Sequence, residues 1–157
     1  MECERVCSQN RQRVNAFIQE HWHSETMILR GREIDMTKTE GFCFCEDGQI
    51  VGLVTYIIYD DVLEITSLDS LHERRGIGSR LLELVRQEAK VRKAKKIVLI
   101  TTNDNINAIR FYQKRGFDMA GFFRNALDVS RRLKPEIPLI GENSIPLRHE
   151  IEFEMLV

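Results

Sequence analysis

Three strand-like segments follow one another between residues 41 and 68, and they limit the possible folds more than any other feature of this sequence. The first two, residues 41–45 and 50–59, flank a short polar connection that contains Asp47-Gly48. Asp-Gly between apolar segments is a strong signal for a tight hairpin. A second turn at Asp60-Asp61 leads into residues 63–68. The pattern predicts an antiparallel meander of three strands.

The hydrophobic period becomes helical after this meander. Residues 76–94 place apolar side chains on one face of a helix, namely Ile77, Leu81, Leu82, Leu84, Val85 and Ala89. A short apolar strand at 95–101 follows, then a helix at 105–115 that Gly116 ends. Further strands are expected at 117–123 and 151–157, and a first helix at 6–22, whereas 23–40 is ambiguous.

This order of elements predicts an α+β fold in one domain, residues 1–157. We expect a mixed, mostly antiparallel, twisted sheet of six or seven strands, flanked by about four helices. Residues 124–150 hold all three prolines and form an ordered excursion between the last two strands. An excursion of this length often contributes to function, and its arginines would suit an acceptor that carries an anionic group.

Composition excludes several classes of partner. The net charge is −1, so nothing favours nucleic acid or an anionic membrane. No apolar run reaches the ~20 residues of a membrane span, and the polar start MECERVCSQN lacks the apolar core of a secretion signal. We therefore expect a cytoplasmic protein without membrane or nucleic-acid partners.

The four cysteines do not have the spacing of a typical zinc site. They form C-x3-C (Cys3, Cys7) and C-x-C (Cys43, Cys45), whereas zinc sites favour CxxC pairs. We expect reduced thiols and no metal, with a metal or redox role as the alternative.

The turn between the third strand and the second helix carries the strongest chemical signal. It reads Arg74-Arg75-Gly76-Ile77-Gly78-Ser79. A helix N-terminus offers unpaired N–H groups and partial positive charge, and glycine lets an anion approach the backbone. The turn is thus suited to a pyrophosphate, although a simple tight connection has the same form. Leu81 stands where a Rossmann motif has its third glycine, and the Gly-Lys-Ser/Thr of a Walker A motif is absent.

Two blocks together resemble the GNAT superfamily of acetyl-CoA-dependent N-acetyltransferases. The family turn has the form Arg/Gln-x-x-Gly-x-Gly/Ala, and this chain has Glu73-Arg74-Arg75-Gly76-Ile77-Gly78. A later family helix reads roughly Asn-x-x-Ala-x-x-Phe/Leu-Tyr-x-x-x-Gly-Phe, matched by Asn105 to Phe117. The resemblance covers residues 41–123 well and implies a GNAT-like fold.

The resemblance also implies roles for individual residues. Acetyl-CoA, as a cosubstrate, would be held by Leu68, Ser70, Arg74, Arg75, Gly76, Ile77, Gly78, Ser79, Asn105, Ala108 and Phe111. Tyr112 would be the general acid that protonates the CoA thiolate. Glu64 is the preferred general base, because period-2 spacing would put it on one face with Thr66 and Leu68. Asp69 and Asp104 are weaker candidates.

The expected reaction is direct attack of an amine on the thioester, and the acceptor is a small-molecule or peptide amine. A homodimer is possible. Glu73 departs from the family's Arg or Gln, and a carboxylate near a pyrophosphate is unfavourable. Glu73 therefore mildly favours the alternative function, a non-catalytic acyl-CoA sensor or interaction module of the same fold. Tyr112, Asn105 and both turn glycines favour the enzyme. A plain scaffold has no support in the sequence.

Overall fold

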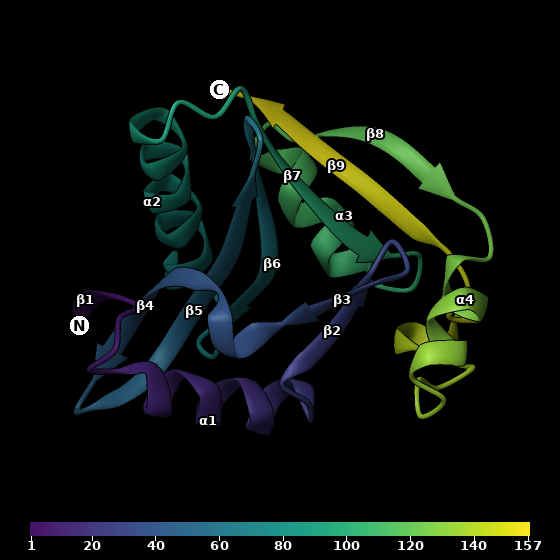
Figure 1. Cartoon of the computed structure of the whole chain (residues 1–157), viewed down its shortest axis with the longest axis horizontal. Helices are drawn as coiled ribbons and strands as arrows, with labels where there is room; N and C mark the ends of the chain where they lie inside the picture. The colour runs from purple at the N-terminus through teal and green to yellow at the C-terminus, as the bar shows by residue number, and fades with distance from the viewer. The chain divides into compact units, whose positions relative to one another are not determined.

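The computed structural model describes residues 1–157. The chain forms two compact units, one of Met1–Met27, Asp35–Ile97 and Val157, the other of Ile28–Ile34 and Val98–Leu156. Four α-helices accompany a seven-stranded, mostly antiparallel sheet and a separate two-stranded sheet (Figure 1). The predicted α+β class is confirmed, whereas the single domain over 1–157 stays a prediction.

The first unit contains the predicted meander. Its strands lie in the order β1 (Glu2–Arg5), β4 (Glu40–Glu46), β5 (Gln49–Tyr59) and β6 (Val62–Ser70), and each neighbouring pair is antiparallel. Asp47 and Gly48 in the β4–β5 turn both have positive φ, 50° and 77°. This is the backbone that tight hairpins require and that Asp-Gly readily adopts.

Helices α1 (Arg11–Trp22) and α2 (Ile77–Val91) cover opposite faces of this part of the sheet. On one face the Arg80 guanidinium of α2 lies 4.5 Å from the ring centroid of Phe44. On the other face Asn10, at the N-terminus of α1, donates from Nδ2 to the carboxylate of Glu4. Glu4 pairs with Cys43 across β1 and β4, so the cysteines of β4 share the α1 face.

The helix expected at 6–22 is present but begins five residues later, and a strand that was not expected precedes it. Residues 2–5 form β1 against β4, and Val6 N donates to Gly41 O at 2.9 Å. Helix α1 begins only at Arg11, because Asn10 turns the chain by accepting from Cys7 N at 2.8 Å. The ambiguous stretch 23–40 contains the hairpin β2 (Thr26–Leu29) and β3 (Arg32–Asp35), followed by the 3₁₀ turn η1 (Met36–Lys38).

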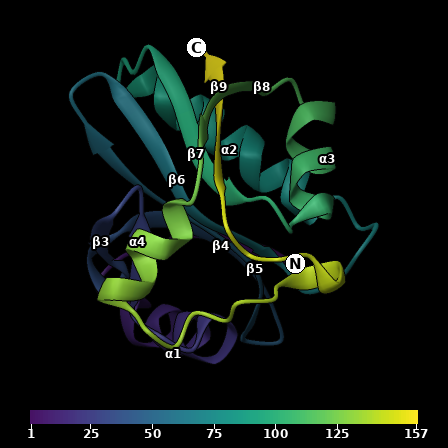
Figure 2. The same ribbon diagram turned by 90° about the vertical axis from the view of Figure 1, so that its right-hand side faces the viewer.

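The second unit contains most of β7 (Lys96–Thr102) together with β9 (Glu150–Leu156) and β8 (Asp118–Phe123), in that order. Helix α3 (Ile106–Lys114) carries Tyr112, whose ring lies 5.5 Å from that of Phe117 and 6.1 Å from that of Phe153. Phe153 is fully buried. These aromatic rings form the core of the unit, and Figure 2 shows α3 beside β8 and β9.

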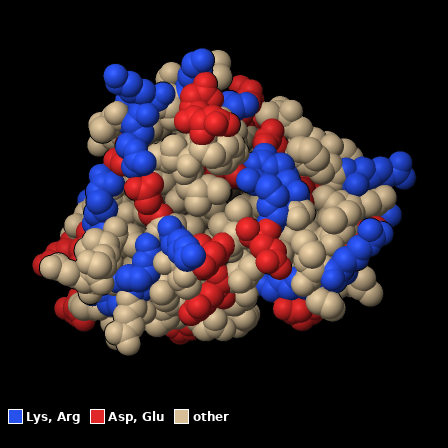
Figure 3. Space-filling view, in the orientation of Figure 1, with Lys and Arg blue, Asp and Glu red and all other residues tan.

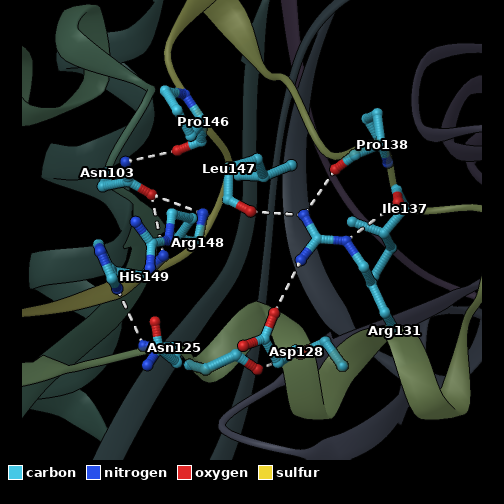
Figure 4. A network of polar contacts seen from close by, with 12 residues as sticks. Asn103, Asn125, Asp128, Arg131, Ile137, Pro138, Pro146, Leu147, Arg148 and His149 are labelled. Atoms are coloured by element: carbon cyan, nitrogen blue, oxygen red, sulfur yellow. Dashed lines mark hydrogen bonds and ion pairs between the residues drawn. The ribbon is translucent and has the colours of Figure 1, made fainter.

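The excursion between β8 and β9 is ordered around one arginine. It contains helix α4 (Ala126–Leu133) and the 3₁₀ turn η2 (Glu142–Ser144). Arg131 donates to the carbonyl oxygens of Ile137, Pro138 and Leu147 and pairs with Asp128 (Figure 4). Only 14% of its side chain is exposed. Because its donors are used internally, Arg131 is not available to bind an anionic acceptor as the sequence suggested.

A second group of hydrogen bonds holds the end of the excursion, just before β9. The side-chain oxygen of Asn103 accepts from the backbone N–H groups of Arg148 and His149, at 3.0 and 2.9 Å (Figure 4). Nδ1 of His149 in turn accepts from Asn125 N at 2.9 Å. An unpaired buried backbone group is costly, so these contacts allow a proline-containing segment without regular structure to pack closely.

We expect Arg131→Ala to destabilise the protein by about 2–4 kcal/mol, because the substitution leaves three carbonyl groups without their donor. The neighbouring Arg132 is exposed and serves as the matched control; Arg132→Ala should change stability by less than about 0.5 kcal/mol. Urea unfolding of the purified variants measures both. Equal effects at the two positions would contradict the assignment of Arg131 as the centre of the network.

The surface carries both signs of charge. In Figure 3, basic and acidic side chains are interspersed over the face shown, in keeping with the net charge of −1. No helix is both long and apolar enough to cross a membrane. The expected cytoplasmic location stays a prediction.

Candidate active site

Strand β6, which leads to the glycine-containing turn, carries a bulge at Thr66. Thr55 of β5 pairs with Ser67, and the next residue, Tyr56, pairs with Ile65, so Thr66 has no partner on β5. Thr55 Oγ1 lies 2.7 Å from Thr66 Oγ1 and 2.5 Å from Ser67 Oγ, in a buried position. A bulge bends its strand and re-aims the side chains beyond it.

The bulge changes which side chains share a face of β6. Glu64 pairs with Ile57, whereas Leu68 pairs with Val54, so Glu64 and Leu68 project to opposite faces. The expectation that these two residues share a face is therefore wrong, because period-2 spacing holds only in an unbroken strand. Asp69 pairs with Leu53 and shares the face of Glu64.

The face of Glu64 and Asp69 is the α1 face. Glu64 is fully buried. The indole Nε1 of Trp22, at the end of α1, donates to Asp69 Oδ2 at 2.9 Å. Burial raises the pKa of Asp69, and this hydrogen bond and nearby His21 only partly oppose the shift. Glu64, which is fully buried, and Asp69, which accepts from Trp22, thus lie on one face of β6. Carboxylates in contrasting surroundings are common in acid–base sites.

The turn after β6 has the backbone geometry that an anion site requires. Arg74 and Gly76 both have left-handed φ, 64° and 72°. Gly76 occupies the N-cap position of α2, and no side chain forms a capping hydrogen bond there. A Cβ built on Gly76 would meet no atom within 4 Å, so the turn opens to free space. A helix N-terminus without a side-chain cap, next to a turn with free space at Gly76, is suited to an anion.

One of the two arginines of the turn is ion-paired. Arg75 contacts the carboxylate of Glu46 at the end of β4, with Nη1 to Oε2 at 3.2 Å. Through this hydrogen bond Arg75 lowers the pKa of Glu46. Arg74 is exposed beside it. The turn is thus joined to the β4–β5 hairpin, a contact that no local sequence signal indicates.

The first unit therefore brings together most of the residues that were predicted to bind the cosubstrate or to act as general acid or base. They are Glu64, Leu68, Ser70, Arg74, Arg75, Gly76, Ile77, Gly78 and Ser79, all on β6, the turn and the first turn of α2. The second unit holds the other four, Asn105, Ala108, Phe111 and Tyr112, on or directly before α3.

Helix α3 fixes its predicted functional residues by local contacts. Asn105 caps the helix by accepting from Ala108 N at 3.1 Å, so Oδ1 is used and the amide Nδ2 remains for another partner. The Phe111 ring lies 3.6 Å from the Arg115 guanidinium and 5.2 Å from the Tyr112 ring. Tyr112 is 7% exposed, so packing holds its ring in place.

Asp104, the other carboxylate considered as a base, is used to hold the excursion. Its oxygens accept from Thr102 Oγ1 at 2.5 Å and from Glu142 N at 2.8 Å. A Cβ on Gly141 would lie 2.1 Å from Asp104 Oδ2, so the backbone packs directly on the carboxylate. Asp104 therefore has a structural role in this fold.

Comparison with known proteins agrees with the resemblance. A sequence model of the acetyltransferase (GNAT) family matches residues 8–117. The uncharacterized protein YxbD of Bacillus subtilis is 45% identical over 147 residues, which cover 93% of this chain and 92% of YxbD. The spermine/spermidine N(1)-acetyltransferase of B. subtilis is 29% identical over 86 residues, which cover 48% of this chain and 57% of that enzyme.

A solved structure extends the comparison to the cosubstrate. The crystal structure of a GNAT family acetyltransferase from Elizabethkingia anophelis, with acetyl-CoA bound, is 27% identical to this chain. It superposes with a TM-score of 0.65 and covers 78% of each chain.

Proposed function

Since the chain belongs to the GNAT family of acetyltransferases, we propose that residues 1–157 act as one N-acetyltransferase domain that moves the acetyl group of acetyl-CoA to a primary amine. The observation that carries this proposal is the open turn at Gly76, in which Arg74 and Gly76 are left-handed and helix α2 has no side-chain cap. Its backbone N–H groups would bind the pyrophosphate, and the charge of Arg74 would add to them.

The residues after the bulge would hold the pantetheine arm. Leu68 and Ser70 lie beyond Thr66 on β6, where the bulge bends the strand. Backbone groups in this bent part would hydrogen-bond the pantetheine arm. Asn105 has an amide nitrogen left after capping, and Ala108 and Phe111 would pack near the cosubstrate. The thioester supplies an activated acetyl group, and the chain positions it.

The reaction requires two proton transfers. The neutral amine attacks the thioester carbonyl, a C–N bond forms, the C–S bond breaks and the sulfur leaves as thiolate. Glu64 would take the proton of the amine, and Tyr112 would give its proton to the thiolate. Asp69 is the alternative base because it shares the face of Glu64 and has a raised pKa.

Two measurements on the purified protein test the proposal. Calorimetric titration with acetyl-CoA should show one binding event, and an assay for released CoA thiol should show turnover on part of an amine panel. Because a relative over part of the chain acts on spermine and spermidine, the panel includes polyamines besides aminoglycosides, amino acids and N-terminal peptides. Binding without thiol release on any amine would support the acyl-CoA sensor, which Glu73 favours. No binding would refute both functions.

The general base is identified by a pair of substitutions on one face of β6. We expect Glu64→Gln to lower kcat at least about 100-fold, the usual contribution of proton transfer, with acetyl-CoA affinity unchanged. Asp69→Asn should retain kcat within about threefold. If Asp69→Asn instead removes turnover and the acidic limb of the pH–rate profile, the base is Asp69.

A further inference from the structure

Two buried thiols meet on the α1 face of β4. Cys43 and Cys45 are separated by one residue, so both project to the same face. The register shift beside Cys45 leaves Val51 of β5 without a partner on β4, and therefore does not disturb this alternation. The sulfur atoms are 3.9 Å apart, and the residues are 0% and 4% exposed. Neither thiol takes part in the proposed transfer reaction.

A carboxylate from the neighbouring strand completes the cluster. Glu4 of β1 pairs with Cys43, and a carboxylate oxygen and the two sulfur atoms all lie within 4.8 Å of one another. Asn10 Nδ2 donates to Oε2 at 3.1 Å, and Arg13 pairs with the same oxygen. Oε1 takes part in neither contact. The Cys45 thiol also hydrogen-bonds the Glu4 carboxylate, so the sulfur and the carboxylate are in direct contact.

The cluster has access to solvent through a polar cavity of about 580 Å³. Its lining includes Cys45, Glu4 and Arg13, together with Glu2 and Asp47. A cation can therefore reach Cys45 and Glu4 without opening the sheet, and the cavity has room for a water molecule beside them.

The spacing of the two sulfur atoms fits a tetrahedral metal ion. Zn–S bonds of about 2.3 Å at a tetrahedral angle place two sulfur atoms about 3.8 Å apart, close to the 3.9 Å between Cys43 and Cys45. Two thiolates and one carboxylate supply three negative charges. A divalent ion and the guanidinium of Arg13 together balance them, so the cluster would be neutral.

We propose that Glu4, Cys43 and Cys45 bind a thiophilic divalent cation of the zinc class, with a water molecule from the cavity as the fourth ligand. Each thiol releases its proton to solvent as its sulfur bonds to the metal, and nothing is oxidised or reduced. Asn10 and Arg13 orient the carboxylate, as hydrogen-bonded partners commonly do around metal ligands. The sequence expectation of no metal rested on Cys spacing alone, which did not include Glu4.

The site would join β1 to β4. Strand β1 has four residues, and only β4 pairs with it. A ligand that binds the folded chain and not the unfolded chain stabilises the fold by mass action. The metal would thus fix the N-terminal strand independently of acetyl transfer.

The test uses the full chain, reduced, with Zn²⁺ titrated against a chromophoric chelator. The parent is the Cys3→Ser/Cys7→Ser variant, which lacks the two exposed thiols and keeps the buried pair. We expect one Zn²⁺ per chain, and Co²⁺ should give the visible absorption of a tetrahedral thiolate complex. In this parent background, Cys45→Ser should lower the affinity at least 100-fold and Glu4→Gln at least 10-fold.

Folding is checked separately, because Cys45 is buried. Circular dichroism and thermal unfolding are recorded for every variant with and without Zn²⁺, which should raise the unfolding midpoint of the parent by several degrees. Glu4→Gln, a substitution at a half-exposed residue, should remove most of this rise even if Cys45→Ser proves unstable. Absence of Zn²⁺ uptake by the parent, or unchanged affinity in folded Cys45→Ser or Glu4→Gln, would overturn the proposal.

Discussion

Gly78→Asp should abolish measurable acetyl-CoA binding while the chain stays folded. Gly78 is the second residue of α2 and has no positive φ, so its backbone accepts a side chain. Aspartate in the first turn of a helix favours the helix by about 0.3–1 kcal/mol, because its charge complements the dipole. The same charge within about 4 Å of a pyrophosphate costs about 4 kcal/mol near a protein surface. The substitution should therefore keep or raise the stability of the fold while it lowers the affinity for acetyl-CoA.

The matched control for this prediction is Gly78→Asn, which has nearly the same size and no charge. We expect calorimetry to show at least a 100-fold loss of affinity for Gly78→Asp and a smaller loss for Gly78→Asn. Thermal unfolding should show Gly78→Asp at least as stable as Gly78→Asn. Retained acetyl-CoA affinity in the aspartate variant would place the pyrophosphate elsewhere and remove the main support for the transferase.

Tyr112→Phe should lower kcat at least about 10-fold with little change in acetyl-CoA affinity. The substitution removes one hydroxyl and keeps the ring that packs against Phe117 and Phe153, so the core of the second unit is retained. Without a proton donor the CoA thiolate is a poorer leaving group, and general acid catalysis commonly contributes 10²–10⁴-fold. Steady-state kinetics with an amine from the panel, together with calorimetry, separates kcat from binding.

Tyr56→Phe is the control for a buried tyrosine hydroxyl outside the proposed site. Tyr56 is fully buried in β5, and burial raises its pKa to about 12. We expect its removal to leave kcat within about twofold. If Tyr112→Phe also retains full turnover, another group protonates the thiolate, and Tyr112 is a core residue only.

Several parts of the fold follow from local sequence. The Asp-Gly turn, the alternating strands of the meander and the helical period of α2 each depend on neighbouring residues, and each appears where it was expected. The glycine turn and the Asn105–Phe117 block are also local, so the resemblance to acetyltransferases could be found from them. Their backbone preferences act before any tertiary contact forms.

The excursion shows where local prediction ends. Prolines and polar residues indicate only an irregular segment between residues 124 and 150. Its order comes from the side chains of Arg131, Asn103 and Asp104, which satisfy backbone groups up to 46 positions away along the chain. The sequence shows that these polar side chains exist, but their partners depend on which backbone groups the fold leaves unpaired.

The sequence by itself determined the order and type of most elements, because periodicity and turn chemistry are properties of adjacent residues. Only the tertiary structure decided that residues 2–5 pair with β4, that Glu64 and Leu68 face opposite ways, and that Glu4 lies beside Cys43 and Cys45. Each of these depends on strand register, and a shift of one residue moves a side chain to the other face. Register is set by contacts between distant segments, which no local pattern records.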